Sequence, residues 1–106
     1  MDNYSIKTQF EEYISRLEGK RRFNEYTMGE CEVIAKRAKA MMGEFAFDPD
    51  DGFTRDKIQQ ADEYFDKAIS YSERHHNDGR KSEAQAIMDV LNNADAGLQV
   101  FLQIFE

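Results

Sequence analysis

Apolar residues recur at regular intervals along the last quarter of the chain. The steps between them alternate between three and four residues, and the set consists of Ala84, Ile87, Leu91, Ala94, Leu98, Phe101 and Phe105. Since a helix turns once in 3.6 residues, these side chains share one face and form a heptad seam over about three repeats. The spacing therefore predicts a long C-terminal helix that packs against other helices.

Three further helices are indicated by apolar spacing upstream of the seam. The intervals predict helices over about residues 5–18, 28–42 and 55–76. Breaks are expected near Gly19–Tyr26, Gly43–Phe53 and Asn77–Gly79, where glycine and turn-forming residues gather. Short connections favour up-down packing of neighbouring helices. The 106 residues are thus expected to form one all-α domain over 1–106, a small antiparallel bundle of three to four helices.

Local signals mark the expected helix ends. Thr27 and Glu30 fit a capping box, in which the Thr27 side chain would cap the start of the second helix. Gly43 fits the C-terminal end of that helix. Thr54 and Ser82 are the residues expected to cap the third and fourth helices.

The negative charge is concentrated in the middle of the chain. The net charge is −7, and residues 44–66 hold eight acidic and two basic residues. Nucleic-acid phosphates would be repelled by such a block, so the charge favours a basic protein surface and no direct nucleic-acid binding. The candidate partner-binding residues are Asp48, Asp50, Asp51, Asp62, Glu63 and Asp66. The alternative is a solvated helix face that serves solubility.

Three phenylalanines lie within the first part of this acidic block. Phe45, Phe47 and Phe53 flank the turn-forming sequence Asp48-Pro49-Asp50-Asp51-Gly52. We expect all three rings to pin this loop against the core, because large apolar side chains are seldom left in water.

A smaller basic block lies near the first predicted break. Residues 16–39 contain seven basic and four acidic residues. Arginines beside an aromatic ring suit a phosphate or a nucleotide. The candidate anion-binding residues are Arg21, Arg22, Lys36 and Tyr26. This pattern supports an alternative function, an oligomeric helical binder that sequesters a small anionic ligand such as a nucleotide.

The residues that usually carry catalysis or bind metals do not fall into the necessary patterns. An EF-hand loop starting at Asp48 would place Gly52 at the fifth position instead of the sixth. His75 and His76 are adjacent, so on a helix they point about 100° apart. Cys31 lies on the apolar stripe of the second helix and is expected to be a core thiol. We therefore expect no catalytic residue, no metal site and no cofactor.

The C-terminal helix carries apolar residues beyond its seam. Val100, Leu102 and Ile104 lie off the seam, and a helix packed on one side of a small bundle needs only one stripe. They are the candidate self-association residues of a homo-oligomer, and Gly97 is consistent with close approach of another backbone. The alternative is a central helix wrapped by the other three.

Together these features favour a non-enzymatic interaction protein. We expect a phage-type inhibitor or adaptor that occupies a basic, nucleic-acid-binding surface of a protein partner and self-associates. A structural assembly component is a further alternative. The N-terminus lacks a basic region followed by an apolar stretch, there is a single cysteine, and no long apolar run suits a membrane. A cytoplasmic location is therefore expected.

Overall fold

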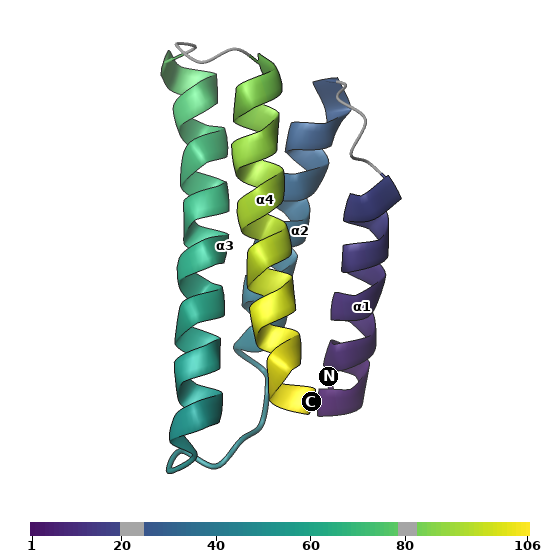
Figure 1. Ribbon diagram of the computed structural model, residues 1–106, viewed down its shortest axis with the longest axis vertical. Coiled ribbons are helices and arrows are strands. Elements are labelled where there is room, and N and C mark those ends of the chain that lie inside the picture. The colour runs from purple at the N-terminus through teal and green to yellow at the C-terminus, as the bar shows by residue number, and fades with distance from the viewer. Residues whose placement is uncertain (20–24, 79–82) are drawn as a thin grey trace.

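A computed structural model describes residues 1–19, 25–78 and 83–106 of the chain. These residues form four α-helices, α1 (Asn3–Gly19), α2 (Glu25–Met42), α3 (Gly52–Asp78) and α4 (Glu83–Leu102), followed by a short 3₁₀ helix, η1 (Gln103–Phe105). The same residues contain no β-strand. The predicted all-α bundle is confirmed (Figure 1).

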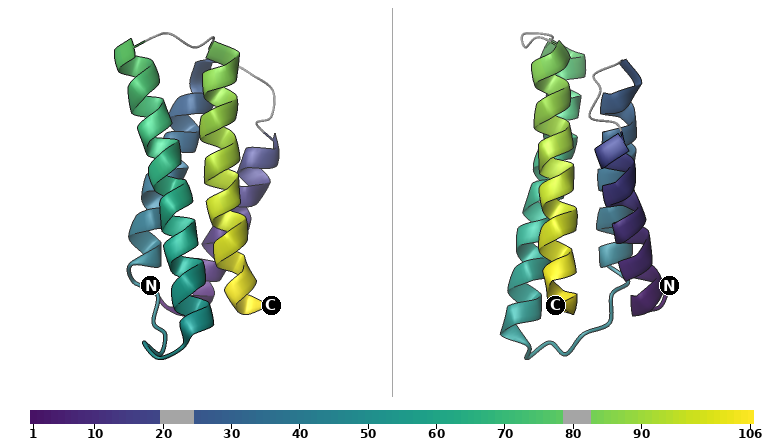
Figure 2. Two further views of the ribbon diagram at one scale, coloured as in Figure 1. Left: turned by 60° about the vertical axis from the view of Figure 1, so that its left-hand side comes forward. Right: turned by 45° about the vertical axis from the view of Figure 1, so that its right-hand side comes forward.

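The helices pack side by side into a long, narrow bundle. Its principal extents are 43 × 24 × 20 Å. Helix α4 packs against each of the other three helices, most extensively against α3, and the α3–α4 pair lies beside the α1–α2 pair (Figures 1 and 2). The α2–α3 loop and both ends of the chain lie at the same end of the bundle.

The heptad seam of α4 is the main apolar surface of the core. Its central members are buried, namely Ile87, Leu91, Ala94, Leu98 and Phe101. The seam is weaker at its two ends, since Ala84 in the first turn is exposed and Phe105 in η1 is half-buried. The predicted periodicity therefore describes an internal face of the folded chain.

Three aromatic rings from three helices meet at the centre of this core. The Phe10 ring of α1 lies 4.4 Å from the Phe101 ring of α4 and 6.2 Å from the Phe65 ring of α3, measured between centroids. The Phe10–Phe65 pair has an edge-to-face geometry with an interplanar angle of 73°, which suits the quadrupoles of aromatic rings. This contact joins α1 to the α3–α4 pair.

Gly97 brings α4 close to α3. A Cβ atom added to Gly97 would lie 2.5, 2.7 and 2.9 Å from the Cε1, Cδ1 and Cζ atoms of Phe65. The close neighbour of Gly97 is therefore an aromatic ring of the same chain, and no second chain is needed to explain a glycine at this position.

Two of the predicted N-terminal caps are wrong. Helix α2 begins at Glu25, so Thr27 lies within its first turn, where its side chain is buried. Helix α3 begins at Gly52, and Asp51, not Thr54, caps it. Both threonines lie inside the first turn of a helix, a place that Thr side chains suit as well as the N-cap position.

The N-terminal end of α1 and the C-terminal end of α2 lie close to the predicted positions. Helix α1 begins at Asn3, because the Asp2 carboxylate accepts a hydrogen bond from the Ser5 amide at 2.7 Å. Helix α2 ends at Met42, directly before Gly43 as expected. The predicted cap Ser82 lies outside the described residues.

The Gly97–Phe65 contact gives a direct test of the packing. Gly97→Ala should lower the free energy of unfolding by about 1–3 kcal/mol, because the added methyl group overlaps a buried ring. Gly29→Ala is the matched control, since no described atom lies within 4 Å of its added Cβ and it should gain up to about 1 kcal/mol from helix propensity. Urea denaturation of both variants measures the difference. Equal stability of the two variants would contradict the close approach of α3 and α4.

The Ser72 hydroxyl offers a second test. This side chain is buried in α3, and its oxygen has no hydrogen-bond partner among the described residues. Ser72→Ala should therefore raise the free energy of unfolding by about 1 kcal/mol or more, since an unsatisfied buried hydroxyl is removed. Ser15→Ala on the exposed side of α1 should gain only about 0.5 kcal/mol through helix propensity. A loss of stability in Ser72→Ala would mean that the hydroxyl is satisfied in solution.

Candidate functional site

The predicted partner-binding residues fall into two groups. Asp48, Asp50 and Asp51 are exposed on the α2–α3 loop at one end of the bundle. The other group lies further along α3 and consists of Asp62, Glu63 and Asp66. At the α-helical rise of about 1.5 Å per residue, Asp62 is about 16 Å from Asp51. The fold therefore separates the acidic block of the sequence into a loop group and a helix group.

The helix group is partly neutralised within the bundle. The Lys39 ammonium group of α2 lies 3.1 Å from an Asp62 oxygen and 2.5 Å from an Asp66 oxygen. The hydrogen bond to Asp66, followed by the contact with Asp62, raises the pKa of Lys39. Glu63 is exposed on the neighbouring part of the helix surface. One lysine thus holds two of the three carboxylates, and these face α2.

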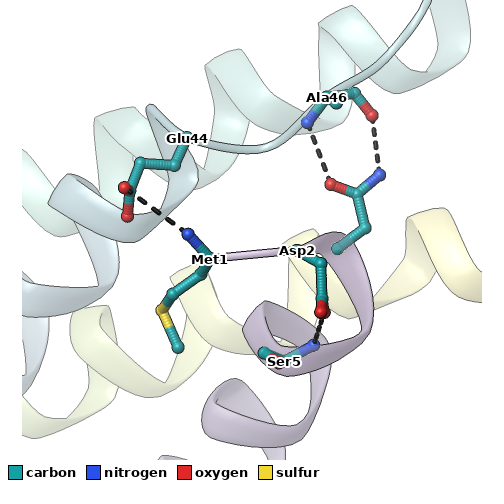
Figure 3. Close-up of polar contacts among 6 residues, drawn as sticks. Met1, Asp2, Ser5, Glu44 and Ala46 are labelled. Carbon is teal, nitrogen blue, oxygen red and sulfur yellow. Dashed lines mark hydrogen bonds and ion pairs between the residues drawn. The ribbon is translucent and has the colours of Figure 1, made fainter.

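The loop group lies on a segment that α1 holds in place. The Asn3 side-chain amide donates to the Ala46 carbonyl oxygen at 2.7 Å, and its oxygen accepts from the Ala46 amide at 2.9 Å (Figure 3). The N-terminal ammonium group of Met1 lies 3.7 Å from a Glu44 oxygen. The two hydrogen bonds of Asn3 satisfy the backbone of Ala46 as a neighbouring strand would.

A tight turn follows this clamp. The Asp48 carboxylate accepts a hydrogen bond from the Asp50 amide at 2.9 Å, and the Asp48 carbonyl oxygen accepts from the Asp51 amide at 2.9 Å. Proline at the second turn position sets the backbone angle that this turn requires. The Arg55 guanidinium group donates to the Pro49 carbonyl oxygen at 3.2 Å. The turn is therefore bonded both within itself and to α3.

Asp51 connects the turn to α3. Its carboxylate oxygens accept from the Thr54 amide at 3.1 Å and from the Thr54 hydroxyl at 2.7 Å. These bonds, the one from the hydroxyl first, hold the pKa of Asp51 below its ordinary value. Because both oxygens bind Thr54, Asp51 stabilises the loop's conformation, although it is exposed like Asp48 and Asp50.

The three loop phenylalanines have different environments, and only part of the prediction for them is right. The Phe45 ring packs edge-on against Phe101 at 5.1 Å and against Phe105 at 5.6 Å. Phe47 stacks on Phe45 at 6.1 Å but is 39% exposed, and Phe53 is 58% exposed. Phe45 alone fills the adjacent core position, so the other two rings remain at the surface.

The candidate self-association residues contact the core of their own chain. Val100, Leu102 and Ile104 are half-buried and pack against the buried cluster. The second apolar stripe is therefore partly covered within its own chain. Self-association through these residues stays a prediction.

The candidate anion-binding residues are not brought together in the described part of the chain. Arg21 and Arg22 lie outside the described residues, as does the side chain of Tyr26. Lys36 is on the exposed side of α2, 3.3 Å from a Glu32 oxygen. Binding of a nucleotide likewise stays a prediction.

The residues with reactive or metal-binding side chains do not form a site in the described part of the chain. Cys31 is buried in α2, as expected for a core thiol. The described residues include no group of three His, Cys, Asp or Glu side chains placed to hold a metal ion; the side chains of His75 and His76 lie outside them. Within the described ranges, no helix is both long and apolar enough to span a membrane.

The loop-shaping role of Asn3 and the capping role of Asp51 were missed from the sequence. Asn3 forms its bonds with a residue 43 positions away, and no local pattern announces such a contact. The Asp51 cap could have been found, because an aspartate directly ahead of an apolar-periodic run is a helix start signal.

The Asp51 cap gives a pH-dependent prediction. Since the folded-state pKa lies below the ordinary 3.8, the cap's contribution to stability is present above that value and is lost as pH falls through the folded pKa. Asp51→Asn keeps an oxygen acceptor but does not titrate there. Between about pH 6 and about pH 3, the denaturation midpoint of the unsubstituted chain should therefore fall more than that of Asp51→Asn. Parallel pH profiles would show that Asp51 does not cap α3.

No protein-family model, no curated protein and no solved structure matches this chain. Its function must therefore be inferred from its own residues and surfaces.

Proposed function

We propose that this chain is a non-enzymatic interaction protein, an inhibitor or adaptor, that occupies a basic, nucleic-acid-binding surface of a protein partner. The binding region is the acidic segment, defined as residues 44–56. It contains five acidic residues and one basic residue, a net charge of −4. More than half of the net charge of −7 therefore falls within this segment, in which Glu44 is paired with the N-terminal ammonium group.

The single observation that carries this proposal is that the acidic segment is exposed and yet hydrogen-bonded to both α1 and α3. Asn3 holds it at Ala46, the Asp48 turn shapes its tip, and Asp51 connects it to α3. A loop fixed before binding loses little conformational entropy when a partner binds. A segment kept only for solubility would need charge but not this set of specific hydrogen bonds.

The charge at the tip would act mainly on the rate of encounter. Exposed carboxylates of one sign attract a basic surface over a distance of about one Debye length, roughly 8 Å at physiological salt. Complementary charge also disfavours acidic partners, including nucleic acid itself. The α3 acids that Lys39 holds contribute less, because their charge is already compensated within the bundle.

The test begins with affinity capture from the cells that make the protein, with partners identified by mass spectrometry. The association rate of an identified partner is then compared between the unsubstituted chain and Asp50→Asn/Asp56→Asn. Both side chains are exposed, so the fold should be kept. We expect the rate at low salt to fall about three- to tenfold, and its dependence on salt to weaken.

The matched control is Glu11→Gln/Glu18→Gln, which changes the net charge equally on the exposed side of α1. This control should retain most of the association rate. If both double variants lose the same amount, only the overall charge matters. If neither loses any, the acidic segment is a solvated surface and the proposal is wrong.

A further inference from the structure

Two large aromatic rings are exposed within the acidic segment. Phe47 is 39% and Phe53 is 58% exposed, whereas Phe10, Phe65 and Phe101 are buried. Single apolar side chains at a protein surface are common and need no explanation. These two, however, flank one tight turn and are six residues apart, so they lie within about 20 Å of each other.

Both rings are attached to rigid parts of the molecule. Phe47 stacks on Phe45 with an interplanar angle of 21°, and Phe45 packs in turn on Phe101. Phe53 belongs to the first turn of α3, which Asp51 caps, and the Lys57 ammonium group lies 5.5 Å from its ring centroid. Rigid aromatic side chains lose little entropy on binding and are typical anchors of protein interfaces.

Carboxylates lie close to these rings in the sequence, as do the basic residues Arg55 and Lys57. Asp48 and Asp50 lie between the two phenylalanines, and Asp56 follows Phe53 by less than one turn of α3. A partner surface that contains only cations, such as a smooth nucleic-acid-binding face, would satisfy the carboxylates but leave both rings in water. A surface with apolar sockets bordered by Lys or Arg would satisfy both, and its cations could also lie over the ring faces.

We infer that Phe47 and Phe53 are the anchors of this interface, and that the partner is a protein whose basic surface contains apolar sockets for these two rings. The inference rests on the proposed function and specifies the partner's chemistry. Binding energy comes mainly from burial of the rings, while the carboxylates supply orientation and rate. Charge complementarity selects a basic protein segment as the occupant.

The test uses a phage-displayed library of random peptides as the probe and the full-length chain as the bait. Peptides that bind should combine Lys or Arg with large apolar residues. Phe47→Ala/Phe53→Ala should bind these peptides more than about tenfold less tightly than the unsubstituted chain, because both anchors are lost. Phe53→Ala alone leaves the Phe45–Phe47 stack in place and should show a smaller loss.

The control is Val33→Ala, which removes a side chain that is 45% exposed on α2. This variant should bind the peptides as the unsubstituted chain does.

Peptides that are basic only, or that bind the double phenylalanine variant equally well, would overturn the inference while leaving the proposed function standing. Peptides that depend on the rings but ignore Asp50→Asn/Asp56→Asn would instead overturn the proposed function. A library that yields no peptide preferring the unsubstituted chain over the phenylalanine variant also overturns the inference.

Discussion

The contact between the Phe65 ring and the Gly97 backbone is the constraint on which the rest of the bundle depends. It allows α3 and α4 to approach at a distance that any side chain at position 97 would prevent. With Phe65 held there, its ring forms the edge-to-face contact with Phe10, and Phe10 in turn packs on Phe101. Helix α1 therefore docks on a surface that exists only because α3 and α4 are already close. A close-packed interior of this kind tolerates few changes of volume.

The surface features follow from this core through two further connections. Phe101 and Phe105 provide the apolar site on which Phe45 packs, and this fixes the start of the α2–α3 loop. The docked α1 brings Asn3 to the backbone of Ala46. Phe47 and Phe53 follow these two fixed points in the sequence and remain exposed, while Phe45 packs beside Phe101 and Phe105. The exposed acids lie close to them in the sequence because the turn between the two rings carries these acids.

How much could be predicted from the sequence depended on the range of the interactions involved. The seam of α4 was predictable, because its burial repeats with the period of the helix itself. The ends of α2 and α3 were placed less well, since Thr27 and Thr54 fit more than one position in a first turn. The pairing of Lys39 with Asp62 and Asp66 requires knowing that α2 lies beside α3. The exposure of Phe53 could not be predicted, because phenylalanine is usually buried. Only the structure shows that Phe45 occupies the apolar site beside Phe101 and Phe105.

The side chain of Asn3 connects the beginning of the chain to a loop that follows two helices later. The conformation of the loop and the docking of α1 are therefore thermodynamically coupled. Any molecule that prefers the loop in its clamped conformation must also favour the docked state of α1, and by reciprocity whatever loosens α1 must weaken that molecule's binding. Occupation of the loop would thus protect amide hydrogens along α1 from exchange, at a distance from the surface that is occupied.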